Sequence, residues 1–236
     1  MPQRALDSQS EAESLVVAKY IDVTGPLAPN IWSYRPLTPD NPLFEIHRFA
    51  TVPERGWEAD AFSMSTLTGT YLETSKHLWP DHRPIAEVPL ERFFVDATIA
   101  CIPKGARGHI TVADLEAAVE ELNAGDALIV ATGWDKHWFD DGTIFVMESP
   151  HFDLDAMKWI SAKGVSILGG DMPCFDDPQP GGGQDVNRVL FGGDALILAP
   201  LVGLDQISKP RVRLNVFPLK LADACGSPCR AIVIED

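Results

Sequence analysis

Short apolar runs alternate with helical patterns in the second half of the chain, and this alternation most constrains its fold. The run 127–131 has the length and composition of a buried strand. The sequence before it predicts a helix that begins after Thr111, the N-cap, with Asp114 three residues on and an apolar face reaching Leu122. A second helix is predicted over 153–163. Strands that alternate with helices indicate an α/β fold.

Other segments extend this pattern. Residues 44–49 alternate apolar and polar side chains, the period of a half-buried strand. The Pro-rich segment 25–42 is expected to form a long loop without regular structure. Further strands are predicted over residues 62–72, 93–100, 165–168 and 195–201.

Composition narrows the class of protein. The chain has 236 residues, of which 45% are hydrophobic, which suits one domain with a sizeable core, here residues 20–236 after a leader over 1–19. The net charge of -15 argues against nucleic acid as a partner, because phosphate binding needs clustered Lys and Arg. No apolar run has the length of a membrane span, and the N-terminus lacks a signal-peptide core. A cytoplasmic protein with reduced cysteines is expected.

The segment 66–77 carries the most specific pattern. It contains Gly69 and Thr70, with His77 seven residues after Thr70. This spacing resembles the motif H-x-G-T-H-x-D-x-P-x-H of the cyclase family, the metal-dependent hydrolases that include kynurenine formamidase and isatin hydrolase. Five more segments resemble those of the family in the same order, namely 20–27, 85–94, 125–134, 169–173 and 226–231. The resemblance implies the swivelling β/β/α domain of that family and a homodimer or homotetramer.

The family's metal ligands are mostly replaced. Leu67 and Tyr71 stand where the motif has its two leading histidines, and Glu73 stands in place of the aspartate. Asn187 and Ala199 fall on the positions of a later histidine and glutamate. A divalent metal needs three to four nitrogen, oxygen or sulfur donors. The resemblance therefore predicts that the usual metal site is lost and that no cofactor is needed.

An alternative keeps a metal. Zinc or manganese would then be held by Glu73 and His77 with one further donor, taken from His82, His137 or Asp185.

Glu73 and His77 are the candidate catalytic residues. The histidine that matches His77 handles protons in the family, and an imidazole suits that role near neutral pH. Glu73, four residues earlier, would orient His77 or act as the base. The competing interpretation is structural: His77 holds the loop that follows it, and Glu73 is a buried carboxylate satisfied by its neighbours.

Four residues are candidates for binding a small-molecule substrate. Tyr71 either donates a hydrogen bond to a substrate oxygen or fills the space of the lost ion. Asn187 can orient a ligand through its amide. Trp32 and Tyr34, on the early Pro-rich loop, match a region that supplies pocket aromatics in the family, although core or interface positions are commoner for such residues.

Three functions remain open. The first is a metal-independent enzyme acting on a small amide, lactone or polyketide-like carbonyl compound, for which ring closure, dehydration or isomerisation suits better than hydrolysis of an unactivated amide. The second is an arylformamidase-like metallohydrolase with non-standard ligands. The third is a non-catalytic binding protein that keeps the fold and the pocket.

Overall fold

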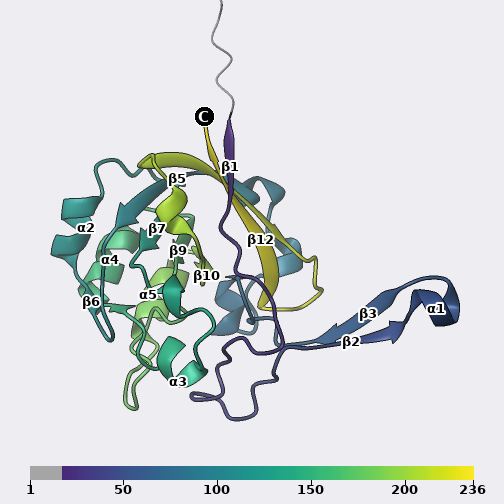
Figure 1. Ribbon diagram of the computed structural model, residues 1–236. Coiled ribbons are helices and arrows are strands. Elements are labelled where there is room, and N and C mark those ends of the chain that lie inside the picture. The colour runs from purple at the N-terminus through teal and green to yellow at the C-terminus, as the bar shows by residue number, and fades with distance from the viewer. Residues whose placement is uncertain (1–17) are drawn as a thin grey trace, which may run out of the picture.

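Seven strands close into a barrel, and an eighth strand lies against its outside edge. The computed structural model describes residues 18–236 (Figure 1). Strand β4 pairs with both β10 and β12, and this double pairing closes the sheet. In spatial order the strands are β1 (Lys19–Asp22), β12 (Gly226–Glu235), β11 (Arg211–Pro218), β5 (Phe94–Cys101), β7 (Ala127–Ala131), β9 (Ile167–Gly170), β10 (Leu196–Ala199) and β4 (Tyr71–Glu73).

The parallel half of the barrel is covered by helices, which confirms the α/β class. Strands β5, β7, β9 and β10 run parallel. Along β7, Leu128 and Val130 face a core shared with the helices, whereas Ala127 and Ile129 face the barrel interior. This alternation follows from the two-residue period of a strand. The covering helices are α2 (Val112–Ala118), α4 (Leu154–Ala162) and α5 (Asp185–Gly192). Helix α4 contacts both α2 and α5. The remaining short elements of this half are α3 (Gly142–Phe145), β6 (His109–Ile110) and β8 (His151–Phe152).

The helix starts agree closely with the sequence, but one end does not. Thr111 and Asp114 form a complete capping box at the start of α2. The predicted continuation to Leu122 is wrong, because Val119 adopts an extended backbone and the helix ends at Ala118. Leu122 still packs against the core, from the loop that follows. The apolar pattern therefore identified a buried face correctly and overestimated the length of the helix.

The predicted strand over 62–72 is in fact two strands. Strand β3 (Ala59–Ser63) ends before a loop, and β4 begins only at Tyr71. Gly69 lies in this loop with a φ of 69°, a left-handed conformation that interrupts an extended strand. The loop separates the two strands into different sheets.

Strand β2 (Glu45–Ala50), the short helix α1 (Val52–Arg55) and β3 form a hairpin arm that projects from the barrel (Figure 1). The strand predicted over 44–49 is present as β2, but the expectation that it is half-buried is wrong, since five of its six residues are exposed. The alternation of Ile46 and Phe49 with charged neighbours does not mark a core face. Large apolar side chains of the arm are exposed instead, among them Ile46, Phe49, Val52, Trp57 and Phe62.

Two expectations concern the ends of the chain and the membrane. Residues 1–17 of the expected leader lie outside the described residues, and Lys19 already pairs with Glu235 in β1. Within residues 18–236, the structure contains no helix that is both long and apolar enough to span a membrane.

Candidate active site

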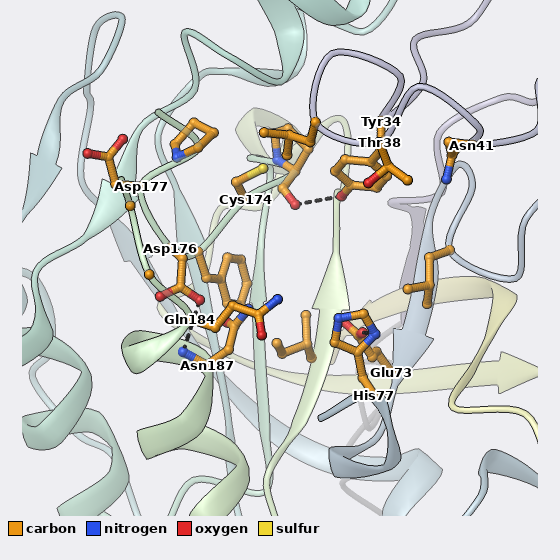
Figure 2. A pocket seen from close by; sticks show the side chains of 18 of the residues that line it. Tyr34, Thr38, Asn41, Glu73, His77, Cys174, Asp176, Asp177, Gln184 and Asn187 are labelled. Carbon is orange, nitrogen blue, oxygen red and sulfur yellow. Dashed lines mark hydrogen bonds and ion pairs between the residues drawn. The ribbon is translucent and has the colours of Figure 1, made fainter. Parts of the chain in front are cut away.

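A cavity of about 450 Å³ opens beside strand β4, between the Pro-rich loop and the segment that leads into α5 (Figure 2). This volume is within the range of small-molecule sites. Tyr71 and Glu73 of β4 line one side, and His77 lies next to them. Asp176 and Asn187 lie across the cavity from His77 in the close-up view.

Strand β4 places two polar side chains on the same wall. Tyr71 and Glu73 are two residues apart, so their side chains project to the same face, and Leu72 projects to the other. Leu72 accordingly packs inside the barrel. Pairing with β10 and β12 on both edges fixes β4 in place. The wall that carries Tyr71 and Glu73 is therefore a rigid part of the barrel.

A short helical turn after β4 places the side chain of His77 next to that of Glu73. Residues Ser75–His77 form a 3-10 helix whose N-cap is Thr74, and the Thr74 hydroxyl accepts a hydrogen bond from the backbone N–H of Lys76. His77 Nδ1 lies 2.9 Å from Glu73 Oε1, and the Glu73 side chain is buried. Interactions with the Cys225 sulfur and with the Glu73 carboxylate raise the pKa of His77 to about 10. His77 is therefore an imidazolium cation at neutral pH.

Two tyrosine hydroxyls meet at the cavity wall. The Tyr34 and Tyr71 oxygens are 2.9 Å apart, and Tyr34 also donates a hydrogen bond of 2.7 Å to the carbonyl oxygen of Pro173. Burial raises the pKa of both phenols well above the usual value near 10. Both tyrosines are therefore neutral across the physiological range.

The opposite wall is organised by Asp176. Its two carboxylate oxygens accept the backbone N–H groups of Val186 and Asn187, at 2.9 and 3.2 Å, in the first turn of α5. Burial raises the pKa of Asp176 to about 6. The Asn187 side chain lines the cavity, and its Oδ1 is buried without a hydrogen-bond partner.

Five of the six residues suggested by the sequence line this cavity, and Trp32 does not. Glu73, His77, Tyr71, Tyr34 and Asn187 are all part of the lining. Trp32 is 2% exposed and packs edge-on against Tyr34 and Trp138. Its expected role in substrate binding is therefore not supported, because aromatic packing keeps its ring in the core.

Several lining residues were not anticipated. Asp176 and Asp177 follow the end of β9, where polar side chains commonly belong to a site, so their position offered a signal that could have been used. Thr38 and Asn41 lie on the loop before the hairpin arm, where nothing in the sequence distinguished them. Cys225 interacts with His77 because Gly226 pairs with Glu73, a register that no local pattern reveals.

The residues present do not fit a divalent metal. Leu67 lines the cavity without a donor atom, and Tyr71 is a neutral phenol that is already hydrogen-bonded to Tyr34. Ala199 lies in β10 and offers no side-chain donor. Among residues 18–236, no group of three or more His, Cys, Asp or Glu side chains has an arrangement that could hold a metal ion.

The alternative donors lie elsewhere. His82 Nδ1 is 2.9 Å from the Ser75 hydroxyl, and its ring stacks on Trp79. His137 pairs with Asp140 at 2.6 Å. Asp185 is exposed in the first turn of α5. None of His82, His137 and Asp185 lines the cavity with Glu73 and His77.

Comparison with known proteins gives a consistent match. The model of the family described as "Putative cyclase" matches residues 21–177. The chain is 28% identical over 194 residues to a kynurenine formamidase of Erythrobacter litoralis, covering 77% of this chain and 83% of the relative. It is 26% identical over 214 residues to that of Bordetella petrii, covering 89% and 96%.

Among solved structures, the fold is similar to an isatin hydrolase bound to the product analogue thioisatinate. The TM-score is 0.82, with 22% sequence identity and 92% of each chain covered. At this level of identity the likeness concerns the fold, and it agrees with the barrel and helix arrangement described above.

Proposed function

Because the chain belongs to the cyclase family, we propose that it is a hydrolase-like enzyme acting on a small carbonyl compound in the cavity beside Glu73 and His77. Amides, lactones and polyketide-like compounds are the substrates considered. The names of the relatives, kynurenine formamidase and isatin hydrolase, support carbonyl chemistry of this kind.

The contact between Glu73 and His77 carries the proposal. These two ionisable groups lie 2.9 Å apart at the edge of a cavity, and the pKa of His77 is about 10. Strongly shifted groups in a cleft are typical of catalytic sites. An imidazolium and a carboxylate side by side provide an acid and a base in one place.

The pair can supply both proton transfers of a hydrolytic reaction. Glu73 takes a proton from water as the water oxygen bonds to the carbonyl carbon, and His77 gives its proton to the leaving nitrogen or oxygen as that bond breaks. Solvent water then takes the proton from Glu73 and returns one to Nε2 of His77, the ring nitrogen that does not face Glu73, which restores both groups. The same transfers in reverse close a ring. Without a metal-activated hydroxide, a strained or activated carbonyl is the expected substrate.

The test is turnover of isatin, formanilide and a phenyl lactone in the presence of chelator. His77→Gln and Glu73→Gln are each expected to lower kcat by about 10²- to 10⁴-fold, the usual contribution of a general acid or base. His82→Gln is the matched control, because it makes the same substitution at a histidine that lies outside the cavity. The His82 ring contacts the Ser75 hydroxyl instead. If the wild-type protein bound these compounds but turned none of them over, the non-catalytic binding protein would be favoured instead.

A metal-dependent hydrolase is the second candidate. It is favoured by one observation, that Glu73 and His77 remain as two potential donors facing one cavity. Loss of turnover in chelator, with recovery on adding zinc or manganese, would select it. A cytoplasmic homodimer or homotetramer completes the proposal.

A further inference from the structure

Strands β6 and β8 form a very short ladder in which two histidines face each other. The strands run parallel over two residues each, with His109 opposite His151, and the centroids of the two imidazole rings are 4.5 Å apart. Backbone hydrogen bonds join the strands, from the N–H of His151 to the Gly108 carbonyl at 3.1 Å and from the N–H of Asp153 to the Ile110 carbonyl at 3.0 Å. We call this paired unit of β6 and β8 the histidine clasp.

The two histidines have opposite environments. His109 is exposed, and its Nδ1 lies 2.6 Å from the Asp153 carboxylate. His151 is 4% exposed, and its Nδ1 is buried without a hydrogen-bond partner among residues 18–236. Burial lowers the pKa of His151 below its ordinary value; the carboxylate of Asp177 opposes this shift, and the neighbouring His109 adds to it. The closed clasp therefore holds His151 as a neutral imidazole.

The clasp is bonded to the wall of the cavity. Phe152 of β8 donates its backbone N–H to the Phe175 carbonyl at 3.0 Å, and the two rings meet edge-on with centroids 5.2 Å apart. A second bond runs from Gln179 Nε2 to the Met147 carbonyl at 2.6 Å. Phe175 and Gln179 both line the cavity. This part of the wall thus rests on β8 and on the chain just before it.

Titratable groups act on His151 from three parts of the fold. His109 faces it from β6, Asp153 follows β8, and Asp177 lies in the cavity wall after β9. The neighbour of Asp177 in the wall, Asp176 (Figure 2), binds the start of α5 instead. A proton on His151 would place a buried cation 4.5 Å from a second imidazole, and two cations at this distance repel each other.

We propose that the histidine clasp is a pH switch in the cavity wall: proton uptake by His151 opens the pairing of β6 with β8 and loosens the wall segment 175–179. An open clasp exposes the imidazole to water, where its pKa returns to about 6.5. Because the open form then binds the proton more tightly than the closed form, acid favours opening. The clasp is expected to be closed above about pH 6.5 and to open progressively as the pH falls below that value.

Hydrogen exchange of backbone amides tests the switch, because exchange of a bonded amide reports local opening. Nuclear magnetic resonance would follow exchange in the full chain at pH 7.5 and at pH 5. Protection factors, which correct for the intrinsic pH dependence of exchange, should fall about 3- to 10-fold for the amides of His151 and Asp153. The Phe152 amide, which bonds to the wall, should follow. Unchanged protection of all three amides at pH 5 would overturn the proposal, and unchanged protection of Phe152 alone would overturn the link to the cavity.

Variants assign the response to one side chain. His151→Gln and His151→Phe cannot take up the proton, so the fall in protection is expected to disappear in both. His47→Gln, at an exposed histidine of the hairpin arm, is the matched control and should keep the wild-type response. Asp176→Asn should also keep it, because the Asp176 carboxylate, with a pKa of about 6, binds α5 and not the clasp. A full acid response in either His151 variant would show that other groups cause it.

A measurement on the wild-type protein covers the case in which neither His151 variant folds. The ring protons of His151 should titrate with a midpoint below about pH 6.5, and a midpoint at or above that value would overturn the switch. None of these measurements uses a substrate. The switch and the proposed function therefore fail separately.

Discussion

The hydroxyl of Tyr71 lies 2.9 Å from that of Tyr34, and the direction of this hydrogen bond is fixed by a third group. Tyr34 is 2.7 Å from the carbonyl oxygen of Pro173, which can only accept. Tyr34 therefore gives its single hydrogen to Pro173, and Tyr71 donates to Tyr34. Tyr71 presents lone pairs to the cavity, so filling space suits it better than polarising a substrate oxygen.

Replacing each tyrosine by phenylalanine distinguishes their roles. Tyr71→Phe is expected to keep turnover within a few-fold and to lower the free energy of unfolding by about 0.5–1.5 kcal/mol, the net value of one hydrogen bond. Tyr34→Phe is expected to cost more, about 1–3 kcal/mol, because it leaves Tyr71 and Pro173 unpaired. Urea denaturation and initial rates measure both. Abolished turnover in a folded Tyr71→Phe protein would make Tyr71 a donor to substrate.

The imidazole of His77 is expected to titrate near pH 10. In Cys225→Ala and Glu73→Gln its pKa should fall towards 6.5, since each variant removes one interaction that favours the cation. Nuclear magnetic resonance titration of the ring protons of His77 measures this directly. A His77 pKa near 6.5 in the wild-type protein would argue against the ion pair.

The same shift links stability to pH. The pKa of His77 is higher in the folded protein than in the unfolded chain, so its contribution to stability is complete below about pH 6.5 and is lost as the pH rises to about 10. The free energy of unfolding should therefore decline over this interval. In Glu73→Gln the decline should be smaller, and an equal decline in both proteins would assign it to other groups.

Metal content tests the altered donor set. Protein purified without a histidine tag is expected to hold well under one equivalent of zinc or manganese by elemental analysis, even after soaking with excess ion. The combined variant Leu67→His, Tyr71→His, Glu73→Asp, which restores the three residues of the family motif, should bind more. Near one equivalent in the wild-type chain would instead revive a metallohydrolase with an unrecognised ligand set.

Asp176 gives ligand binding its own pH dependence. Burial raises the pKa of Asp176 to about 6, so its negative charge develops around that pH. The affinity of the cavity for benzamidine, a cationic aryl amidine, should increase as the pH rises through about 6, because Asp176 lines the cavity, and the increase should disappear in Asp176→Asn. Benzamide, which is neutral, serves as the matched ligand and should show a weaker change. A flat benzamidine profile in the wild-type protein would mean that Asp176 does not act on the ligand.

The start of α2 offers a test of local structure. Thr111→Ala removes the N-cap hydroxyl that accepts the N–H of Asp114, and it is expected to lower the free energy of unfolding by about 0.5–2 kcal/mol. Thr143→Ala, at an exposed threonine, is the control.

The same helix start has a pH dependence of its own. The hydrogen bond from Lys104 lowers the pKa of Asp114 to about 2. The contribution of the Asp114 carboxylate to the free energy of unfolding is therefore complete above the pKa of Asp114 in the unfolded chain, and it is lost as the pH falls to about 2.

Much of the barrel was predictable because its signals are local. Thr111 and Asp114 define a helix start within four residues, and the apolar run of β7 is explained by burial on both faces. The hairpin arm was misjudged because Ile46 and Phe62 alternate with polar residues as a core strand does, although both are exposed. Periodicity records which face is apolar and contains no information on what covers that face.

The residues of the candidate site were predictable where they lie in segments that resemble family motifs. Tyr71, Glu73 and His77 were found through one segment, and Asn187 through a second. Cys225 was missed because it is brought to the site by tertiary pairing, next to Gly226 of β12, which pairs with Glu73. Asp176 was missed although its place after the end of β9 offered a signal. Trp32 was misplaced because its loop shows no period from which inward and outward side chains can be distinguished.

The hairpin arm has a mechanical consequence for the cavity. Asn41 and Ser65, on either side of the arm, both line the cavity. Three residues separate Asn41 from β2, and a single residue separates β3 from Ser65, so there is little slack at either root. The root of the arm is therefore joined directly to the cavity wall at Asn41 and Ser65. A force that bends its far end would be transmitted to the walls that the ligand touches.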